Sequence, residues 1–166
     1  MRWAAFAVEA PVLAERIAAG FTSAGVVLIG TVRGDGSPRL SPVEPVFLEG
    51  ELYLDMMWQS QKARDLLRDP RCEVHAAPAD RLAPQLKLRG RVVEVHETGP
   101  RDRFVAHVCE HLGWSPYPQH HLFRVEVEGA AWISYDDPNG WVHVRRWRPG
   151  DHRERGPYPP AGSGEE

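Results

Sequence analysis

A serine and a lysine two residues apart stand where a helix is expected to begin. Ser60 precedes residues 61–68, a stretch typical of a short helix that ends ahead of Pro70. The first turn of a helix carries free backbone N–H groups and the positive end of the helix dipole, so it attracts anions. With the Lys62 ammonium and the Arg64 guanidinium close by, this turn predicts a phosphate site. Taken alone, an ordinary helix cap and a solvated lysine explain the same pattern.

The residues before this helix are expected to form three antiparallel strands in succession. The apolar run 26–32 is typical of a strand, and a Gly-Asp-Gly sequence after it supplies the positive φ values of a tight turn. The next strand, 38–48, contains Pro42 and Pro45, which cannot donate to a sheet ladder, so it must be irregular or lie at an edge. A third strand over 52–57 then leads into the helix.

The rest of the chain predicts a mainly β fold with flanking helices and about six to seven antiparallel strands. Regular strand–helix alternation is absent, which favours a small antiparallel barrel over a doubly wound parallel sheet. Residues 1–148 are expected to form one domain. Residues 149–166 are rich in Gly, Pro and charge without periodicity, so we expect a disordered tail. Further helices are expected at 98–112 and at 11–22, where Leu13, Ile17 and Phe21 recur every four residues and indicate one buried face. Further strands are expected at 72–76, 85–96, 121–134 and 141–147, and apolar residues alternate with charged ones within the second and third of these.

The order of these elements, together with Ser-Gln-Lys-Ala-Arg-Asp-Leu at 60–66, resembles the FMN-binding split β-barrels of the pyridoxamine 5'-phosphate oxidase-like superfamily. That superfamily includes the flavin/deazaflavin oxidoreductases. Its members grip the cofactor phosphate with an S-x-K or x-K-x-R-N-L element after the third strand, which Ser60 and Lys62 match. Asp65 departs from the pattern, since many relatives carry Asn there. A carboxylate beside a phosphate is unfavourable, so we expect Asp65 to point away or to pair with an arginine.

The resemblance implies further cofactor contacts. The second-strand backbone would lie along the isoalloxazine ring, the two methionines would contact the ring or the ribityl chain, and Lys87 would approach the pyrimidine end of the flavin. Trp132 would contact the cofactor, often from a second subunit. Each residue also has an ordinary structural interpretation as edge strand, core or surface. The implied set is Arg39, Leu40, Ser41, Pro42, Met56, Met57, Ser60, Lys62, Lys87 and Trp132.

The function that the resemblance implies is flavin-dependent oxidation or reduction. FMN would be held by its phosphate, and hydride would pass to or from a small organic substrate. No side chain stands out as an obligatory acid or base. One alternative is the deazaflavin coenzyme F-420, whose longer phosphodiester tail would call for a wider basic groove. Another is a non-catalytic flavin- or haem-binding module.

Charge, cysteine content and histidine spacing limit the kinds of partner and the location that the sequence favours. A net charge of -3 gives no general argument for a nucleic-acid or membrane partner. Two cysteines without a C-x-x-C motif favour reduced thiols and a cytoplasmic location. His107 and His111 share a helix face but lack a clear third ligand, so no metal site is expected. The resemblance also implies a homodimer with the cofactor at the interface.

Overall fold

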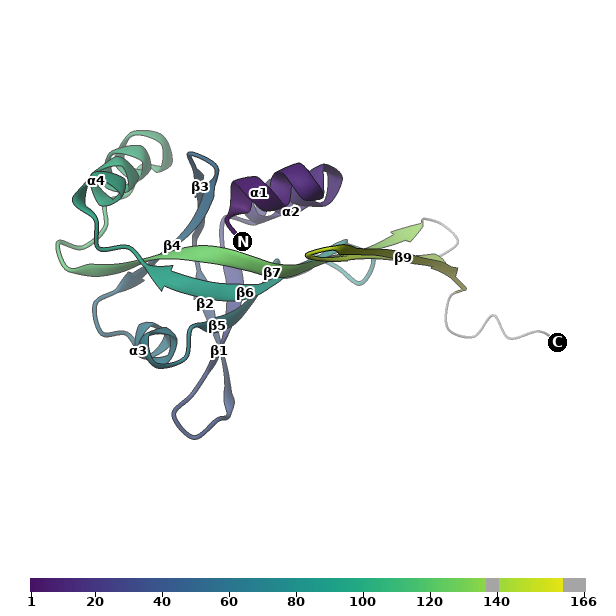
Figure 1. Cartoon of the computed structure of the whole chain (residues 1–166), viewed down its shortest axis with the longest axis horizontal. Helices are drawn as coiled ribbons and strands as arrows, with labels where there is room; N and C mark the ends of the chain where they lie inside the picture. Colours follow the sequence, from purple (N-terminus) through teal and green to yellow (C-terminus); the bar gives the residue numbers. More distant parts are fainter. Residues whose placement is uncertain (137–140, 160–166) are drawn as a thin grey trace.

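The computed structural model describes residues 1–136 and 141–159, and within them nine strands form one antiparallel sheet flanked by helices (Figure 1). No helix of this described part is both long and apolar enough to cross a membrane. In chain order the elements are α1 (Trp3–Glu9), α2 (Pro11–Ala24), β1 (Val27–Val32), β2 (Pro38–Val43), β3 (Pro45–Leu48), β4 (Glu51–Met57), α3 (Gln61–Arg68), β5 (Arg71–His75), β6 (Gln85–Glu94), α4 (Thr98–His107), the π-helical turn η1 (Val108–Leu112), β7 (His120–Asp136), β8 (Trp141–Arg148) and β9 (Asp151–Tyr158).

The order of the strands explains why the barrel is split. Seven strands run β2-β1-β5-β6-β7-β4-β3 across the sheet, so the consecutive strands β2 and β3 lie at its two ends. Only Glu44 separates them in the chain, which requires the sheet to curl until its ends approach. Pro42 and Pro45 flank this junction, and neither has a backbone N–H group to donate to a neighbouring strand. The expected antiparallel split β-barrel is confirmed, and the sheet is not closed by hydrogen bonds.

Two apolar clusters hold the helices against the sheet. The larger lies beneath α1 and α2, where Phe6, Ile17 and Phe21 are fully buried together with residues of the barrel strands. The four-residue spacing of Ile17 and Phe21 predicted this buried helix face correctly. The smaller cluster lies beneath α4 and includes Tyr53 and Phe104, whose ring centroids are 5.9 Å apart. The short helix α1 was not predicted.

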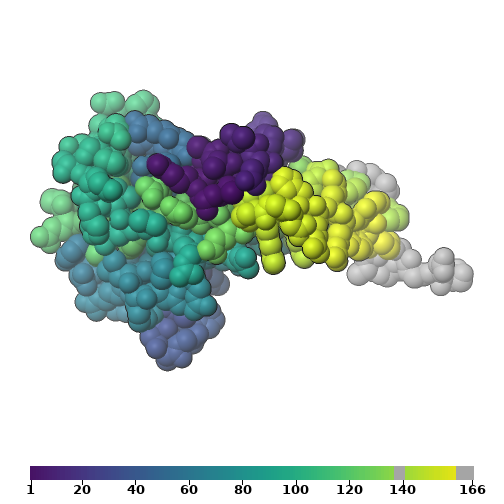
Figure 2. All heavy atoms as spheres, viewed as in Figure 1, coloured from purple at the N-terminus to yellow at the C-terminus, as the bar shows by residue number. Residues whose placement is uncertain are grey.

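Strand β7 belongs to two parts of the molecule. Residues 120–124 pair with β4 and residues 123–133 pair with β6, whereas residues 130–136 pair with β8 beyond the end of β4. The second half of β7 therefore leaves the barrel and, with β8 and β9, forms a projecting arm (Figure 1). In Figure 2 the arm, coloured yellow-green to yellow, stands beside the N-terminal helices and reaches beyond the barrel.

The expectation of a disordered tail is wrong for Asp151–Tyr158, which forms strand β9. Asp151–Tyr158 pairs with β8 instead of lying free, after a turn in which Gly150 has φ +74°. Two contacts support the pairing: Arg145 and Glu154 form an ion pair at 2.8 Å, and the His152 ring meets the Trp147 ring edge-on. Its Arg, Glu, Gly and Pro composition is unlike that of ordinary strands, which is why periodicity did not reveal it. Residues 160–166 of the expected tail lie outside the described residues.

Candidate functional site

The N-terminus of α3 has a hydroxyl that the fold leaves without a partner. Ser60 occupies the N-cap position, but its side chain makes no capping hydrogen bond. The Ser60 Oγ atom is buried and has no hydrogen-bond partner within the described residues. Since a buried hydroxyl without a partner costs free energy, a ligand that accepts its proton would stabilise this arrangement. The first backbone N–H groups of α3 are free for the same ligand.

Lys62 joins α3 to the end of β2. Its Nζ donates a hydrogen bond to the carbonyl oxygen of Pro42 at 2.5 Å. Burial lowers the pKa of the Lys62 ammonium, and the nearby carboxylates of Glu44 and Asp55 partly offset that effect. The ammonium therefore lies in a partly desolvated position, where a further anion would favour its charged form.

A cleft of about 310 Å³ opens beside Lys62. It is bounded by the end of β2, the end of β4, the start of α3 and the loop that follows η1. Four residues of the implied cofactor set line it, so the structure brings together parts of the chain that are up to twenty residues apart. Its lining residues are Val26, Pro42, Val43, Glu44, Asp55, Met56, Met57, Lys62, Trp114, Ser115, Pro116 and Tyr117.

Asp65 faces away from this cleft and is held by basic residues, which confirms the expected pairing with an arginine. Its buried carboxylate accepts hydrogen bonds from Arg39 Nε at 2.6 Å, Thr31 Oγ1 at 3.0 Å and Arg68 Nη2 at 3.3 Å. Burial raises the pKa of Asp65, but the three hydrogen bonds outweigh it, so the pKa lies below its usual value. Asp65 thus anchors α3 to β1 and β2, and it engages the Arg39 guanidinium in doing so.

The remaining residues of the implied set lie elsewhere in this chain. The Leu40 side chain is 71% exposed on β2. Lys87 lies on the outer face of β6 in a separate hollow with Arg146. Trp132 lies between two guanidinium groups, with Arg16 at 5.3 Å and Arg145 at 4.8 Å from its ring centroid. Within one chain, neither Lys87 nor Trp132 shares a hollow with Lys62, so their expected flavin contacts stay predictions.

A buried polar cluster behind the cleft was not predicted. The His120 Nδ1 atom lies 2.7 Å from the Tyr117 carbonyl oxygen, and its Nε2 lies 2.9 Å from Arg101 Nη2. Since a guanidinium can only donate and a carbonyl can only accept, this geometry assigns a neutral ring with its proton on Nδ1. His120 Nε2 is also 3.7 Å from Asp55 Oδ1, an atom that has no hydrogen-bond partner within the described residues.

Asp55 is the cluster residue that reaches the cleft. Burial raises the pKa of its carboxyl, and the nearby Arg101 guanidinium partly offsets that effect. The sequence does hold a signal for it, because Asp55 interrupts the apolar strand β4 between Leu54 and Met56. A single polar residue in an apolar strand does not by itself indicate which residues it meets across the sheet. The pairing of β4 with β7, with Asp55 opposite Leu122 and Met57 opposite His120, decides that.

Comparison with known proteins defines the class. Residues 13–133 match the family described as "Pyridoxamine 5'-phosphate oxidase", which is well over half of the chain, and the chain belongs to that family. No curated protein sequence matches it.

Three solved structures illustrate the fold likeness. Campylobacter jejuni ChuZ has a TM-score of 0.73 at 12% identity, covering 93% of this chain and 67% of ChuZ. A pyridoxamine 5'-phosphate oxidase-related, FMN-binding protein of Nostoc punctiforme has a TM-score of 0.62 at 14% identity, covering 88% of this chain and 94% of that protein. A haem-binding protein of Mycobacterium smegmatis has a TM-score of 0.59 at 21% identity, covering 77% of this chain. The chain spans only 54% of the length of that mycobacterial protein.

Proposed function

We propose that this chain binds FMN in the cleft beside Lys62, with the phosphate at the N-terminus of α3, and acts as a flavin-dependent oxidoreductase. The observation that carries the proposal is the unpartnered, buried Ser60 Oγ at the N-terminus of α3, two residues before Lys62, which lines this cleft. The Nostoc relative, which is described as FMN-binding, supports the same cofactor.

The residues present fit a phosphate. Free N–H groups and the Ser60 hydroxyl stand at the start of α3, and Lys62 belongs to its first turn. Asp65, whose carboxylate would be unfavourable beside a phosphate, is bound to Arg39 and Arg68. An incoming phosphate would replace the Pro42 carbonyl as the partner of Lys62 and restore the pKa that burial lowers. Ser60 Oγ would have to rotate toward the ligand, a change of one side-chain torsion.

The ring would lie along β2 and β4. Pro42 has no N–H group to donate to the ladder that it forms with β1, and the Met57 side chain, with its polarisable thioether, is 58% exposed. A bound flavin supplies the chemistry of hydride transfer, and the chain supplies binding and orientation. Asp55 adds to the cleft a carboxyl whose pKa is raised by burial, so a polar group stands where a substrate could form a hydrogen bond.

Deazaflavin F-420 and haem are the competing ligands. F-420 would bind through the same phosphate-binding residues, so Ser60 and Lys62 do not indicate which of the two cofactors the chain binds. The Mycobacterium smegmatis relative is described as haem-binding, which supports haem as a second candidate. No histidine stands among the described residues that line the cleft, which favours a flavin there. His120 makes hydrogen bonds through both ring nitrogens, whereas His121 has its Nδ1 2.6 Å from Glu94 Oε1 and its Nε2 without a partner within the described residues.

We also propose that the chain forms a homodimer that completes the site. The cleft volume of about 310 Å³ is at the low end of the ~300–1,000 Å³ typical of small-molecule sites. Its mouth exposes large apolar side chains, with Trp58 52% and Tyr117 66% exposed. A second copy would cover them and could bring Trp132 to the cofactor. Sedimentation of the cofactor-loaded protein should then give twice the chain mass, whereas a monomer would refute the shared site.

The deciding experiment is a titration with FMN, F-420 and haemin, followed by absorbance and fluorescence, on wild-type protein and on Lys62→Ala. We expect saturable binding of a flavin, weakened in Lys62→Ala by about 10- to 100-fold, because the variant loses a charge-assisted contact worth ~1.5–3 kcal/mol. Arg103→Gln, on the exposed side of α4, is the matched control and should bind as wild type does. Equal flavin affinity in Lys62→Ala would overturn the phosphate assignment, and a Soret band with no flavin binding would replace FMN by haem.

A further inference from the structure

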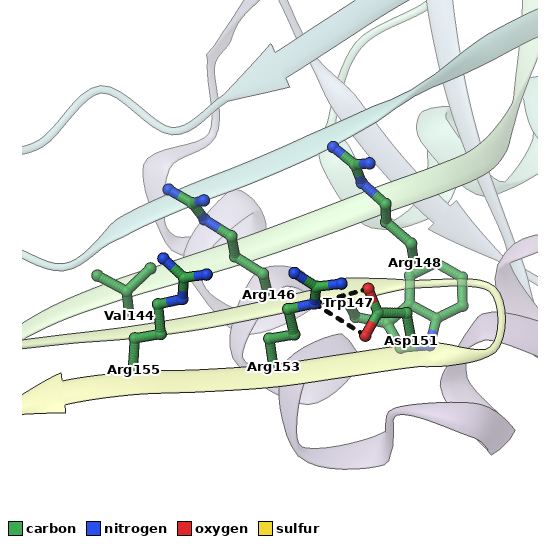
Figure 3. Close-up of a pocket in the computed structure, with 7 residues that line it drawn as sticks. All are labelled: Val144, Arg146, Trp147, Arg148, Asp151, Arg153 and Arg155. Atoms are coloured by element: carbon green, nitrogen blue, oxygen red, sulfur yellow. Dashed lines mark hydrogen bonds and ion pairs between the residues drawn. The ribbon is translucent and has the colours of Figure 1, made fainter.

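A second, strongly basic hollow lies on the outer face of the sheet and shares no residue with the cleft. Two adjoining hollows of about 260 and 150 Å³ meet at Arg146 and Arg148 on β8. Figure 3 shows four arginines of the second hollow with their guanidinium groups on one side of the β8–β9 hairpin. The six cations that line the two hollows are Lys87, Arg89, Arg146, Arg148, Arg153 and Arg155.

Strand register places these cations on both sides of a row of small residues on β7. Lys87 on β6 stands opposite Ala131 on β7, Ala131 stands opposite Arg146, and Arg146 stands opposite Arg153 on β9. The neighbouring row is similar, because Arg89 pairs with Gly129. A Cβ atom added at Gly129 would lie 3.8 Å from both Arg89 Nε and Arg148 Cγ. Small residues on β7 therefore leave a groove between the cations of β6 and those of β8.

The fold leaves these charges poorly compensated. Within residues 1–136 and 141–159, Arg153 is the one member of the six that forms an ion pair, with Asp151 at 2.8 Å. Arg146 and Arg153 are directly opposite each other, and like charges in that position destabilise a sheet. Glu73 is the other carboxylate that lines the groove. The lining of the two hollows therefore holds six cations and two acids, although the whole chain has a net charge of -3. This local excess of positive charge indicates an anionic ligand.

The distances between the cations indicate which class of anion can contact several of them at once. Lys87 and Arg146 are separated by one intervening strand, so their backbones stand about 9–10 Å apart, and the two rows are about 6.5–7 Å apart along the strands. A single phosphate would meet one side of this rectangle, whereas two linked phosphates reach both sides. Guanidinium groups bind phosphate oxygens in pairs, which suits the four arginines on the arm. We propose that this groove binds a diphosphate group, either free or as part of a larger molecule.

This proposal does not depend on flavin binding, since no residue of the cleft takes part. It also gives Lys87 a role within a single chain. Pyrophosphate binding to the full chain, measured by calorimetry at low salt, is the direct test. We expect a saturable site that is weaker for orthophosphate by about tenfold or more, because half of the charge-assisted contacts are lost. Orthophosphate binding as tightly as pyrophosphate, or no pyrophosphate binding at millimolar concentration, would overturn the proposal.

Matched variants locate the site. Arg146→Gln should weaken pyrophosphate binding about tenfold or more. Arg146→Lys should restore only part of the lost affinity, because a lysine keeps the positive charge but not the planar guanidinium that donates two hydrogen bonds to one phosphate. Arg103→Gln removes the same charge far from the groove and should bind as wild type does. Thermal melting checks that each variant is folded. Equal affinity in Arg146→Gln and wild type would show that the groove is not the binding site.

Further ligands distinguish the sources of the diphosphate. ADP that binds at least as tightly as pyrophosphate indicates a nucleotide ligand, and ADP that binds more weakly indicates a free diphosphate. A short single-stranded oligothymidine that displaces pyrophosphate and binds more tightly, with a steep salt dependence, would refute the diphosphate and make the face a polymer-binding surface. FMN affinity should remain unchanged in Arg146→Gln, so failure at this site and failure at the cleft give different results.

Discussion

Replacing Asp65 by asparagine tests the structural role of this carboxylate separately from the phosphate site that we propose beside it. In the folded protein the carboxylate is buried and accepts hydrogen bonds from Arg39, Thr31 and Arg68. Asparagine has a similar shape but no charge, and its single carbonyl oxygen can replace only part of this set. We therefore expect Asp65→Asn to loosen the contact of α3 with β1 and β2.

The magnitude follows from the two arginine bonds. A hydrogen bond to a charged group contributes ~1.5–3 kcal/mol and a neutral one ~0.5–1.5 kcal/mol, so each conversion costs about 1 kcal/mol. The Arg39 bond is well enclosed, whereas Arg68 is 46% exposed and its contribution must be discounted for solvent screening. Together with one lost acceptor, the free energy of unfolding should fall by about 1.5–3 kcal/mol. For a chain of this length that corresponds to roughly 4–10 °C in Tm.

The pH dependence gives an independent check. The pKa of Asp65 is lower in the folded protein than its usual value, so its contribution is present above about pH 4 and is lost as pH falls through the folded pKa. Urea unfolding of wild type and Asp65→Asn should differ most near pH 7 and converge in acid. Asp102→Asn, on the exposed side of α4, is the control and should match wild type. Equal stability of Asp65→Asn at pH 7 would refute this account of the ion pairs.

Three further results are expected. Cys72 is buried with its pKa raised to about 12 by desolvation, so iodoacetamide should label the exposed Cys109 in native protein and Cys72 only after unfolding; rapid native labelling of Cys72 would contradict this. Phe6→Ala should lower the free energy of unfolding by ~3–5 kcal/mol, as measured in urea, because the ring is fully buried against Trp147, whereas Val8→Ala should change it little. Gly90→Ala should lower Tm by several degrees, since the new Cβ would lie 2.1 Å from the Glu126 carbonyl oxygen, while Gly129→Ala meets only ordinary contacts and should melt near wild type.

Local patterns in the sequence predicted the elements that depend on neighbouring residues. Pro42 and Pro45 predicted the irregular second strand because a missing N–H is a property of the residue itself. Ser60 and the following residues predicted where α3 begins for the same reason, since caps and first turns depend on a few consecutive residues. The alternation in β6 and β7 predicted their half-exposed strands.

Tertiary structure decided the neighbours that are distant in the chain. Lys87 and Arg146 line one hollow, and Asp55 approaches His120, because strand order and register place them so. Neither arrangement follows from the residues themselves. Register is a collective result of pairing whole strands, so a one-residue shift would move every side chain to the other face. Strand β9 shows the same limit, since it is held by the β8 backbone and not by its own strand propensity. The sequence by itself determined the barrel strands and the start of α3, where we propose that phosphate binds, while only the fold revealed the polar cluster at the cleft and the basic groove on the arm.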